Sequence, residues 1–355
     1  MRGRGDRLAS RLAERELDRM LVTNLVNVRY LTGFTGTNGV CVCGADERLF
    51  LTDFRYTERA AEETEGWEVV TIEDDWLGGV AERLSGRVGF EDDQMSVRTR
   101  ERLGEKVADG VELTPAGGVV EKLRRIKDAG ELASIAAAAE LADDVWGWSI
   151  ERGLAGRTER EVARAAEARI RELGAEPSFP AIVAAGPNGA LPHAEPGERE
   201  IERGELVVFD MGARLDGYCS DGTRTFAAGE PGEEARAVYE TVRRAQAAAL
   251  DAVEAGAGGE AVDAIARGII EEAGHGERFG HGLGHGVGLE VHETPRVSHR
   301  SEDVLAAGEV VTIEPGIYLP GKLGVRIEDL VVVTEDGHRN LSSLPKELQI
   351  VGEVS

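Results

Sequence analysis

Cysteine is scarce in this sequence, which has only Cys41, Cys43 and Cys219 among its 355 residues. Three thiols at this spacing form neither a disulfide framework nor a zinc knuckle. Cys41 and Cys43 alternate in an apolar segment, so we expect core positions for both. No apolar run is long enough to cross a membrane, and no apolar stretch follows the basic start at Met1–Gly5, as it would in a secretory signal. We therefore expect a cytoplasmic protein without membrane contact.

Positive charge is also in short supply. The chain has 41 Lys and Arg against 66 Asp and Glu, a formal net charge of −25. This balance argues against a nucleic-acid partner, because phosphate binding needs a cationic surface. The hydrophobic content of 41% is ample for globular folding. The length exceeds that of one ordinary core, so we expect two domains.

The first part of the chain alternates helix and strand signals. We expect an amphipathic helix over 7–23 that leads into a strand at Arg19–Val22. Further strands are predicted at Gly39–Cys43 and Arg48–Thr52, followed by a helix from Tyr56 to Glu65. This alternation is typical of an α/β domain. A break at 114–118 sets the expected domains at residues 1–118 and 119–355.

The second part is dominated by helices, with hairpins between them. Asp128 is the expected N-cap of a long helix, with Glu131 at the third position of its first turn. Further helices are predicted from Thr158 to Leu173, over Glu233–Ala255 and over Glu260–Ala273, each followed by a glycine. Antiparallel strands covered by helices on one side make this an α+β domain.

Four acids stand at the polar ends of apolar segments, where burial is costly without a cation: Asp210, Asp221, Glu314 and Glu328. His285, in a glycine-rich segment, is a fifth candidate ligand. Two divalent cations would bring four positive charges against the four carboxylates. Each acid alone is more simply an ordinary strand-end residue, but their paired spacing favours a metal site.

That spacing is set by two turns. Asp210 and Asp221 flank a turn near 215–217, and a hairpin centred there would place the two acids nearly opposite each other. Glu314 and Glu328 flank residues 320–324, and folding about Gly321 again places two acids opposite. Two such hairpins could hold two metal ions about 3.5–4 Å apart.

The histidines and Arg326 have simpler interpretations as well. His281 and His285 are four residues apart, but alternating glycines favour a strand over a zinc-binding helix. The segment after His292 does not continue as His-Glu-x-x-His, which excludes a zincin. His193 could be a solvent-facing loop residue. Arg326 could form a structural salt bridge to one of the acids.

Five motifs follow one another within residues 125–350: Phe-Asp-Met-Gly, Tyr-x-Ser-Asp-x-Thr-Arg-Thr, Gly-His-Gly-x-Gly-His-x-x-Gly-Leu-x-x-His-Glu, Thr-Ile-Glu-Pro-Gly-Ile-Tyr and Gly-Val-Arg-Ile-Glu-Asp. As an ordered set they resemble the Xaa-Pro peptidases, aminopeptidase P and prolidase, of the creatinase/methionine-aminopeptidase superfamily. The segments 30–34 and 51–56 resemble the creatinase-type N-terminal domain. The resemblance implies a creatinase-like α/β domain followed by a "pita-bread" catalytic domain, in a homodimer or tetramer.

The resemblance also implies a ligand set, carried over motif by motif. Asp210 would bind one ion, Asp221 and Glu328 would bridge both, and His285 and Glu314 would bind the second. Glu314 would in addition shuttle a proton to the leaving nitrogen. Oxygen-rich ligands suit Mn²⁺ or Co²⁺, with Zn²⁺ as the alternative.

Five further residues receive roles from the same resemblance. His193 and His292 would contact the substrate around the scissile bond, and His281 would line the pocket. Arg326 would hold the bridging acid and the proton network. Arg296 matches an arginine of the shorter prolidase-like members and would contact a substrate carboxylate.

The expected activity is hydrolysis of the Xaa-Pro bond in dipeptides or short peptides. Prolidase and aminopeptidase P share the motif set, so both remain open; Arg296 and the short chain favour prolidase. Two other classes share this fold: a non-catalytic peptide-binding module, and a metal-independent C–N hydrolase such as creatinase. The complete ligand set argues against both.

Overall fold

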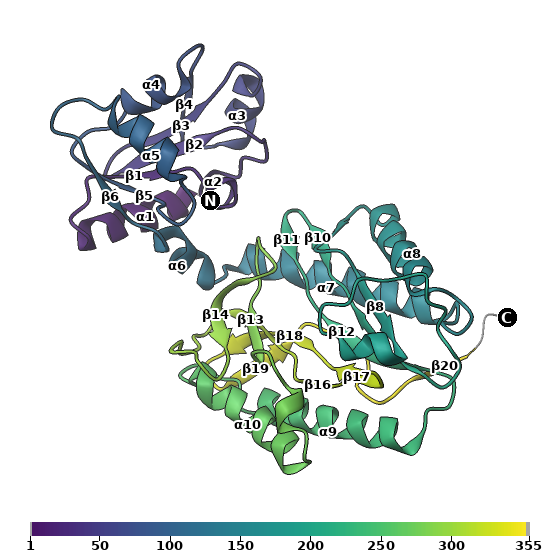
Figure 1. Ribbon diagram of the computed structural model, residues 1–355. Helices are drawn as coiled ribbons and strands as arrows, with labels where there is room; N and C mark the ends of the chain where they lie inside the picture. Colours follow the sequence, from purple (N-terminus) through teal and green to yellow (C-terminus); the bar gives the residue numbers. More distant parts are fainter. Residues whose placement is uncertain (1, 353–355) are drawn as a thin grey trace. The chain divides into compact units, whose positions relative to one another are not determined.

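The computed structural model describes residues 2–352 and divides the chain into two compact units, Met1–Arg124 and Arg125–Ser355 (Figure 1). The sequence places the boundary after residue 118, whereas the division falls within helix α6 (Val119–Arg125). Both units mix helices and sheets, as expected. Within residues 2–352, no helix is long and apolar enough to span a membrane.

The first unit is built on one six-stranded sheet in the order β4-β3-β2-β1-β5-β6. Its strands are β1 (Arg19–Val22), β2 (Val40–Gly44), β3 (Arg48–Thr52), β4 (Glu68–Thr71), β5 (Arg87–Phe90) and β6 (Glu112–Pro115). Its other helices are α1 (Arg2–Glu14), α2 (Leu25–Thr32), α3 (Thr57–Glu63), α4 (Trp76–Ala81) and α5 (Val97–Gly104). Strand β2 runs antiparallel to both neighbours, and the remaining pairs are parallel. This is the α/β domain that the sequence predicts.

One helix of this unit differs from its prediction. The sequence predicts a helix over 7–23, but α1 begins at Arg2 and ends at Glu14. Glu16 has a positive φ of 56°, and the N–H of Leu17 returns to the carbonyl of Leu12 at 3.0 Å. A left-handed residue terminates a helix, so Leu17 is buried beyond the helix and not along it.

The second unit has long helices in two pairs. They are α7 (Ala129–Ile150), α8 (Glu159–Glu172), α9 (Glu233–Leu250) and α10 (Gly259–Glu272). Capping boxes open the first two, one from Asp128 with Glu131 and one from Thr158. Helix α9 ends five residues before the predicted Ala255, because the N–H of Ala255 bonds to the carbonyl of Thr334 instead of continuing the helix.

Short strands lie between the two helix pairs in four sheets. They are β7 (Glu176–Pro177), β8 (Ile182–Ala185), β9 (Leu206–Asp210), β10 (Ala213–Leu215), β11 (Tyr218–Cys219), β12 (Thr223–Ala228), β13 (Gly284–Gly286), β14 (Glu293–Val297), β15 (Val310–Ile313), β16 (Gly316–Leu319), β17 (Leu323–Arg326), β18 (Asp329–Thr334), β19 (Gly337–Asn340) and β20 (Ile350–Val351). Two 3₁₀ turns, η1 (Gly186–Ala190) and η2 (Gly276–Arg278), complete the unit.

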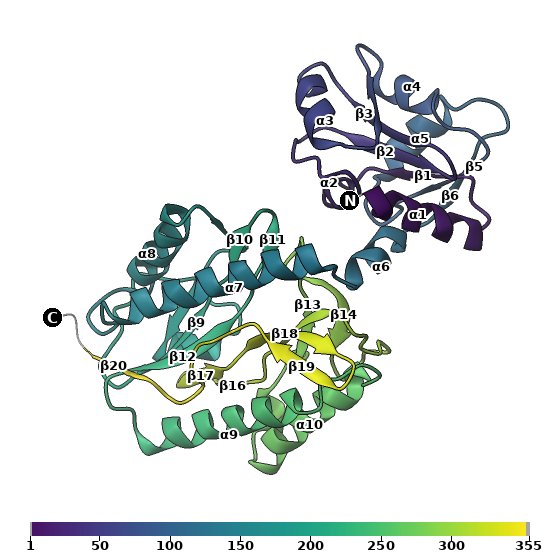
Figure 2. The same cartoon turned by 180° about the vertical axis from the view of Figure 1, so that it is seen from behind.

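Two of the hydrophobic clusters in this unit join the helix pairs to the strands. One joins Trp146 and Ile170 of the α7–α8 pair to Phe209 of β9. The other joins Val242 and Ile270 of the α9–α10 pair to strands β15 to β18. Figures 1 and 2 show the strands between the two pairs, with α7 and α8 along one side and α9 and α10 along the other. The α+β prediction is confirmed, but helices cover both sides of the strands and not one.

Candidate active site

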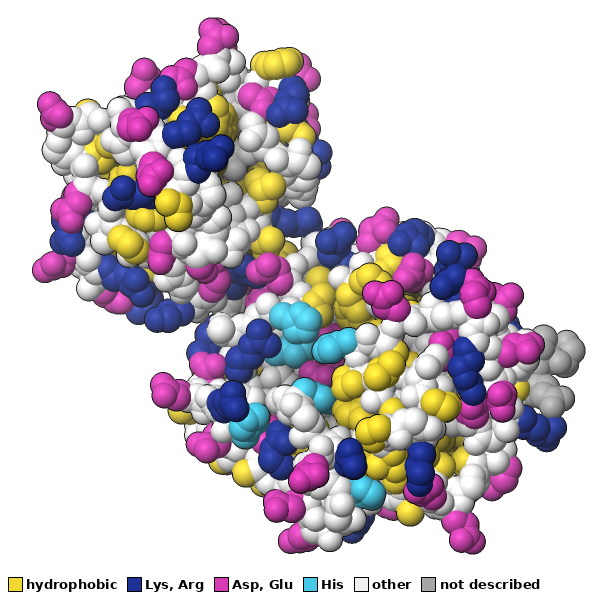
Figure 3. All heavy atoms as spheres, viewed as in Figure 1, with side chains coloured by type: hydrophobic (Ala, Val, Ile, Leu, Met, Phe, Trp, Pro, Cys, Tyr) yellow, Lys and Arg dark blue, Asp and Glu magenta, His cyan; other side chains and the backbone are white. Residues whose placement is uncertain are grey.

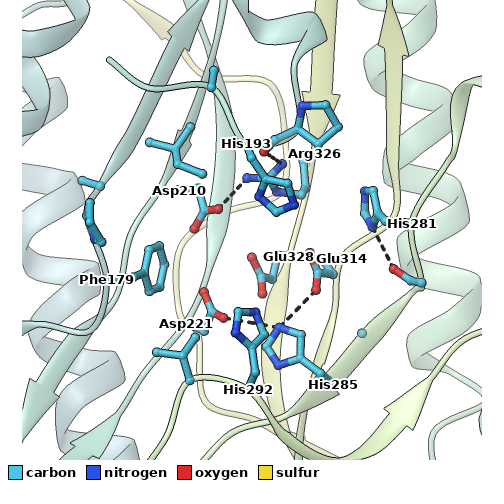
Figure 4. Close-up of a pocket in the computed structure, with 18 of the residues that line it drawn as sticks. Phe179, His193, Asp210, Asp221, His281, His285, His292, Glu314, Arg326 and Glu328 are labelled. Carbon is cyan, nitrogen blue, oxygen red and sulfur yellow. Dashed lines mark hydrogen bonds and ion pairs between the residues drawn. The ribbon is translucent and has the colours of Figure 1, made fainter.

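One cavity of about 650 Å³ in the second unit brings together all ten side chains that the sequence singles out: His193, Asp210, Asp221, His281, His285, His292, Arg296, Glu314, Arg326 and Glu328. They come from several strands and loops that are far apart in sequence. Figure 3 shows histidine side chains gathered on one face of this unit, with acidic side chains between them. In the close-up, the four acids face one another at the centre of the cavity (Figure 4).

The first pair of acids is offset from the predicted register. The turn residues are Asp216 and Gly217, both with positive φ, as a tight hairpin turn requires. A turn centred between 216 and 217 places Thr223 opposite Asp210, and the β9–β12 ladder has this pairing. Asp221 therefore lies two residues from the position directly opposite Asp210, a small shift from the nearly opposite placement that the turn predicts. It lies between β11 and β12, where its side chain still points into the cavity.

The second pair of acids has the predicted register. Strand β16 pairs with β17 so that Gly316 faces Arg326, and β15 pairs with β18 so that Ile313 faces Asp329. Both ladders have the register of a fold about Gly321. Glu314 and Glu328 hold matching positions in the gap between the two ladders. The N–H of Glu314 donates to the carbonyl of Leu283 at 2.8 Å and that of Glu328 to the carbonyl of Thr223 at 3.0 Å, and both carboxylates point inward.

His285 has one ring nitrogen directed at the acids. Its Nε2 lies 3.3 Å from Glu314 Oε1 and 3.6 Å from Asp221 Oδ2. Its Nδ1 lies 3.0 Å from the carbonyl of Gly286, which assigns the proton of a neutral ring to Nδ1. The free lone pair of Nε2 then faces the carboxylates, the orientation of a metal-binding imidazole. Ligand atoms of Asp221, His285 and Glu328 all lie within 4.8 Å of one another.

The guanidinium of Arg326 bonds to Asp210, not to one of the acids expected to bridge, and also to two neutral side chains and the carbonyl of Pro192. Its NH2 nitrogen donates to Asp210 Oδ2 at 2.5 Å, its Nε to Thr223 Oγ1 at 3.0 Å and its NH1 to Tyr318 Oη at 3.0 Å. The threonine hydroxyl in turn donates to Glu328 at 2.7 Å. The salt bridge considered from the sequence is therefore present, and it lies inside the cavity. The other oxygen of Asp210, Oδ1, is buried and has no hydrogen-bond partner among the described residues.

Burial raises the pKa of Asp221, Glu328 and Asp210 above their usual values, and the neighbouring carboxylates raise it further. For Asp210, the charge of Arg326 opposes this. Glu314 differs in the metal-free protein: burial raises its pKa, but a His285 ring protonated on both nitrogens donates a hydrogen bond to it, and that bond with the charge of the ring outweighs burial and brings the pKa to about 2. The positive charge of the surrounding side chains therefore does not fully offset the negative charge of the four acids.

These residues fit divalent cations. Four carboxylates face one arginine, which leaves about three formal negative charges in the cavity. In addition, Asp210 Oδ1 has no hydrogen-bond partner among the described residues. Carboxylate oxygens and one imidazole are ligands for Mn²⁺, Co²⁺ or Zn²⁺.

Comparison with known proteins agrees with this geometry. Residues 126–335 match the metallopeptidase family M24, and residues 4–126 match the creatinase/prolidase N-terminal domain. The chain belongs to metallopeptidase family M24. Membership implies divalent metal ions, and the resemblance noted in the sequence is confirmed.

Three relatives of this M24 chain match over nearly its whole length. The Xaa-Pro dipeptidase of Pyrococcus furiosus is 40% identical and covers 98% of this chain and 100% of its own. The solved structure of an Xaa-Pro dipeptidase from Bacillus anthracis has a TM-score of 0.95 at 40% identity, covering 98% of this chain and 99% of that one. An X-Pro aminopeptidase from Thermotoga maritima has a TM-score of 0.90 at 36% identity, covering 96% and 99%.

The M24 site also contains residues that sequence reasoning did not select. Thr223 and Tyr318 stand inside the quoted motifs but carry no charge, and their bonds to Arg326 appear only in the fold. Thr312 donates to Glu314 at 3.2 Å. Phe179 faces the acids from the opposite wall of the cavity (Figure 4), and nothing in its local sequence marks it.

Proposed function

We propose that this M24 chain is a dinuclear metal-dependent peptidase that hydrolyses the Xaa-Pro bond of dipeptides or short peptides. The observation that carries the proposal is the cluster of three buried acids, the partly buried Glu314 and one imidazole in a single cavity with one compensating arginine. Relatives named for Xaa-Pro cleavage at about 40% identity support the choice of bond.

The ligand assignment is part of the proposal. Asp210 would hold one ion, His285 and Glu314 would hold the other, and Asp221 and Glu328 would be shared by both. The short distances from His285 Nε2 to Asp221 and Glu314 support the grouping. Mn²⁺ or Co²⁺ is the expected metal because oxygen ligands dominate, with Zn²⁺ as the alternative.

Bound divalent ions would supply Lewis-acid polarisation of the peptide carbonyl and activation of water near neutral pH. The residues around them manage protons and charge. Glu314 lines the cavity among the other acids, where its carboxylate could carry a proton to the leaving proline nitrogen. Burial lowers the pKa of His292, so it is a neutral hydrogen-bond donor to the developing oxyanion.

The other candidate residues position the substrate and the acids. His193 lies at the opposite side of the acids from His292 (Figure 4), so the two histidines flank the place of the scissile bond. The ring of His281 is held by Tyr318 Oη at 2.9 Å and lines the cavity. Arg326 fixes Asp210 in place.

Arg296 favours a dipeptide as the substrate. It pairs with His285 across β13 and β14, and its side chain lines the cavity while remaining exposed. Its backbone N–H is fixed by Asp303 Oδ2 at 2.8 Å. A guanidinium in this place can bind the C-terminal carboxylate of a dipeptide. We further propose that the enzyme works as a homodimer in the cytoplasm.

The test is hydrolysis of Xaa-Pro dipeptides beside Xaa-Pro-Yaa tripeptides with Mn²⁺, in the parent and in Arg296→Ala. Loss of the carboxylate contact should raise KM for dipeptides about 10- to 100-fold and leave KM for tripeptides within about threefold. Arg300→Ala removes an exposed arginine four residues on, outside the cavity, and should match the parent. Unchanged dipeptide kinetics in Arg296→Ala, with tripeptides the better substrates, would favour an aminopeptidase P activity.

A further inference from the structure

The loop of residues 186–197 forms one wall of the cavity. It begins with η1 after strand β8 and contributes Pro192, His193, Ala194, Glu195 and Pro196. Arg326 NH1 donates to the carbonyl of Pro192 at 3.2 Å, which fixes the middle of the loop. The place of His193 over the acids therefore depends on what holds the two ends.

Both ends are held by one carboxylate, that of Glu159. This residue begins helix α8 and is fully buried, at 0% exposure. Its Oε1 accepts from the N–H of Ala185 at 2.8 Å, where the loop begins, and its Oε2 accepts from the N–H of Gly197 at 3.1 Å, where the loop ends. The side-chain amide of Asn188, inside the loop, donates to both oxygens at 3.1 Å.

The same backbone corner occurs a second time in this unit. Before α8, Gly156 N–H bonds to Ile201 and Glu159 N–H bonds to Arg199. Before α10, Gly256 N–H bonds to Leu305 and Gly259 N–H bonds to Asp303. An isolated bridge accompanies each corner, Thr158 with Glu200 and Gly258 with Val304.

The residue equivalent to Glu159 in the second corner is thus Gly259, which has no side chain. The corner forms there with the same backbone bonds, so a carboxylate is not needed to make it. The side chain of Glu159 must therefore have a role other than forming the corner. Its three donors all belong to the end of strand β8 and to the loop that carries His193.

We propose that Glu159 is a positioning residue that holds the 186–197 loop closed at both ends and so sets His193 against the substrate. The inference rests on the proposed function, in which His193 contacts the peptide at the scissile bond. Glu159 does not reach the cavity itself; it acts through the loop.

The first experiment is the isosteric variant Glu159→Gln. An amide keeps one acceptor oxygen but turns an N–H₂ group towards either Ala185 or Gly197, so one end of the loop is released whichever way the amide lies. Displacement of His193 by about 1 Å should lower kcat/KM for an Xaa-Pro dipeptide with Mn²⁺ about 10- to 100-fold. Bound manganese should equal that of the parent.

A matched control separates positioning from general loss of stability. Asp143 is another buried carboxylate of the same unit, on α7, and it accepts from the N–H and hydroxyl of Ser343 away from the cavity. Asp143→Asn should lower the melting temperature while kcat/KM stays within about twofold of the parent. An equal loss of kcat/KM in both variants would overturn the proposal.

A double-mutant cycle with His193→Ala tests the route of the effect. If Glu159 acts through His193, Glu159→Gln should change kcat/KM of the His193→Ala protein by less than about threefold. If it lowers kcat/KM there by the same factor as in the parent, the proposal is wrong. Parent-like activity of His193→Ala itself would contradict the proposed role of His193, a different outcome.

Amide hydrogen exchange gives a readout that does not depend on activity. In Glu159→Gln, residues 185–197 should exchange at least about tenfold faster than in the parent, while the equivalent corner at 256–259 is unchanged. Parent-like exchange in residues 185–197 would overturn the proposal even if no peptide substrate were hydrolysed.

Discussion

Each unit of this protein buries carboxylates, but their surroundings differ. In the first unit, Glu91 is 1% exposed and accepts from the N–H of Thr23 at 2.6 Å, the N–H of Asn24 at 2.7 Å and the amide of Asn27 at 2.7 Å. In the second unit, Asp210 has one oxygen paired with Arg326 and the other without a partner among the described residues.

The difference separates a structural acid from a candidate metal ligand. Glu91 is surrounded by hydrogen-bond donors of the protein itself. It therefore links the start of α2 to the end of β5 and needs no cation to neutralise it. The four acids of the cavity face one another and share few donors. Such a cluster is costly unless cations neutralise it, and this is the physical basis for assigning it to metal ions.

The largest expected effect is on activity. Asp221→Asn or Glu328→Gln removes an acid assigned to both ions, so kcat/KM for Xaa-Pro dipeptides with Mn²⁺ should fall by more than about 10³-fold, equal to ~4 kcal/mol of activation free energy. Glu91→Gln, the matched change in the first unit, should stay within about tenfold of the parent. Near-parent turnover in either site variant would remove the two-ion assignment.

A smaller loss of activity is expected where a side chain touches the substrate but no ion. His292→Ala should lower kcat about 10²-fold by removing a donor to the oxyanion. Manganese content, measured by elemental analysis, should equal that of the parent, because the acids and His285 hold the ions. If the content falls by half, His292 is a ligand and the assignment is wrong.

Stability should change in opposite directions in the two units. In metal-free protein, Asp221→Asn relieves repulsion and should raise the free energy of unfolding of the second unit by ~1 kcal/mol, or roughly 2–4 °C in melting temperature. Glu91→Gln places an amide against backbone donors and should lower stability by about 1–3 kcal/mol. Calorimetry in the presence of a chelator measures both. If the melting temperature changes in the same direction in the two variants, the proposed difference between the two kinds of buried acid is wrong.

The smallest effect is the pH dependence of the metal-free protein. Burial and repulsion raise the pKa of Asp210, Asp221 and Glu328, so the stability gained by protonating them is full below their unfolded pKa of about 4 and is lost as pH rises through their folded values. Glu314, with its pKa at about 2, stays ionised in this range. Metal-free protein should therefore melt higher at pH 5.5 than at pH 7.5. The difference should shrink in Asp221→Asn, and a lower melting temperature at pH 5.5 would contradict the account.

Local signals made much of the fold predictable. The capping box of Asp128 and Glu131 and the turn at Gly321 are determined by neighbours in sequence, so the helix start and the register of Glu314 with Glu328 follow from them. The end of α1 depends on the left-handed conformation of Glu16, and the end of α9 on a hydrogen bond from Ala255 to a distant strand. The spacing of hydrophobic residues along the sequence predicts neither.

The same limit applies to the site. The ten candidate residues could be named from the sequence, and all ten line the cavity. The exact partner of Asp210 was missed because the turn is centred between 216 and 217 and not on 216, and a shift of half a residue in a turn centre moves the partner by one residue. The neutral groups Thr223 and Tyr318, and Glu159 behind its loop, matter through contacts between distant segments and could not be read from spacing.

The most direct test of the central claim is a titration of chelator-treated protein with Mn²⁺, in which bound metal and hydrolysis of an Xaa-Pro dipeptide are measured in the same samples. The account predicts no hydrolysis without metal, and activity that reaches its maximum as the second ion per chain binds. Full hydrolysis by the metal-free protein, or a single ion at saturation, would contradict it.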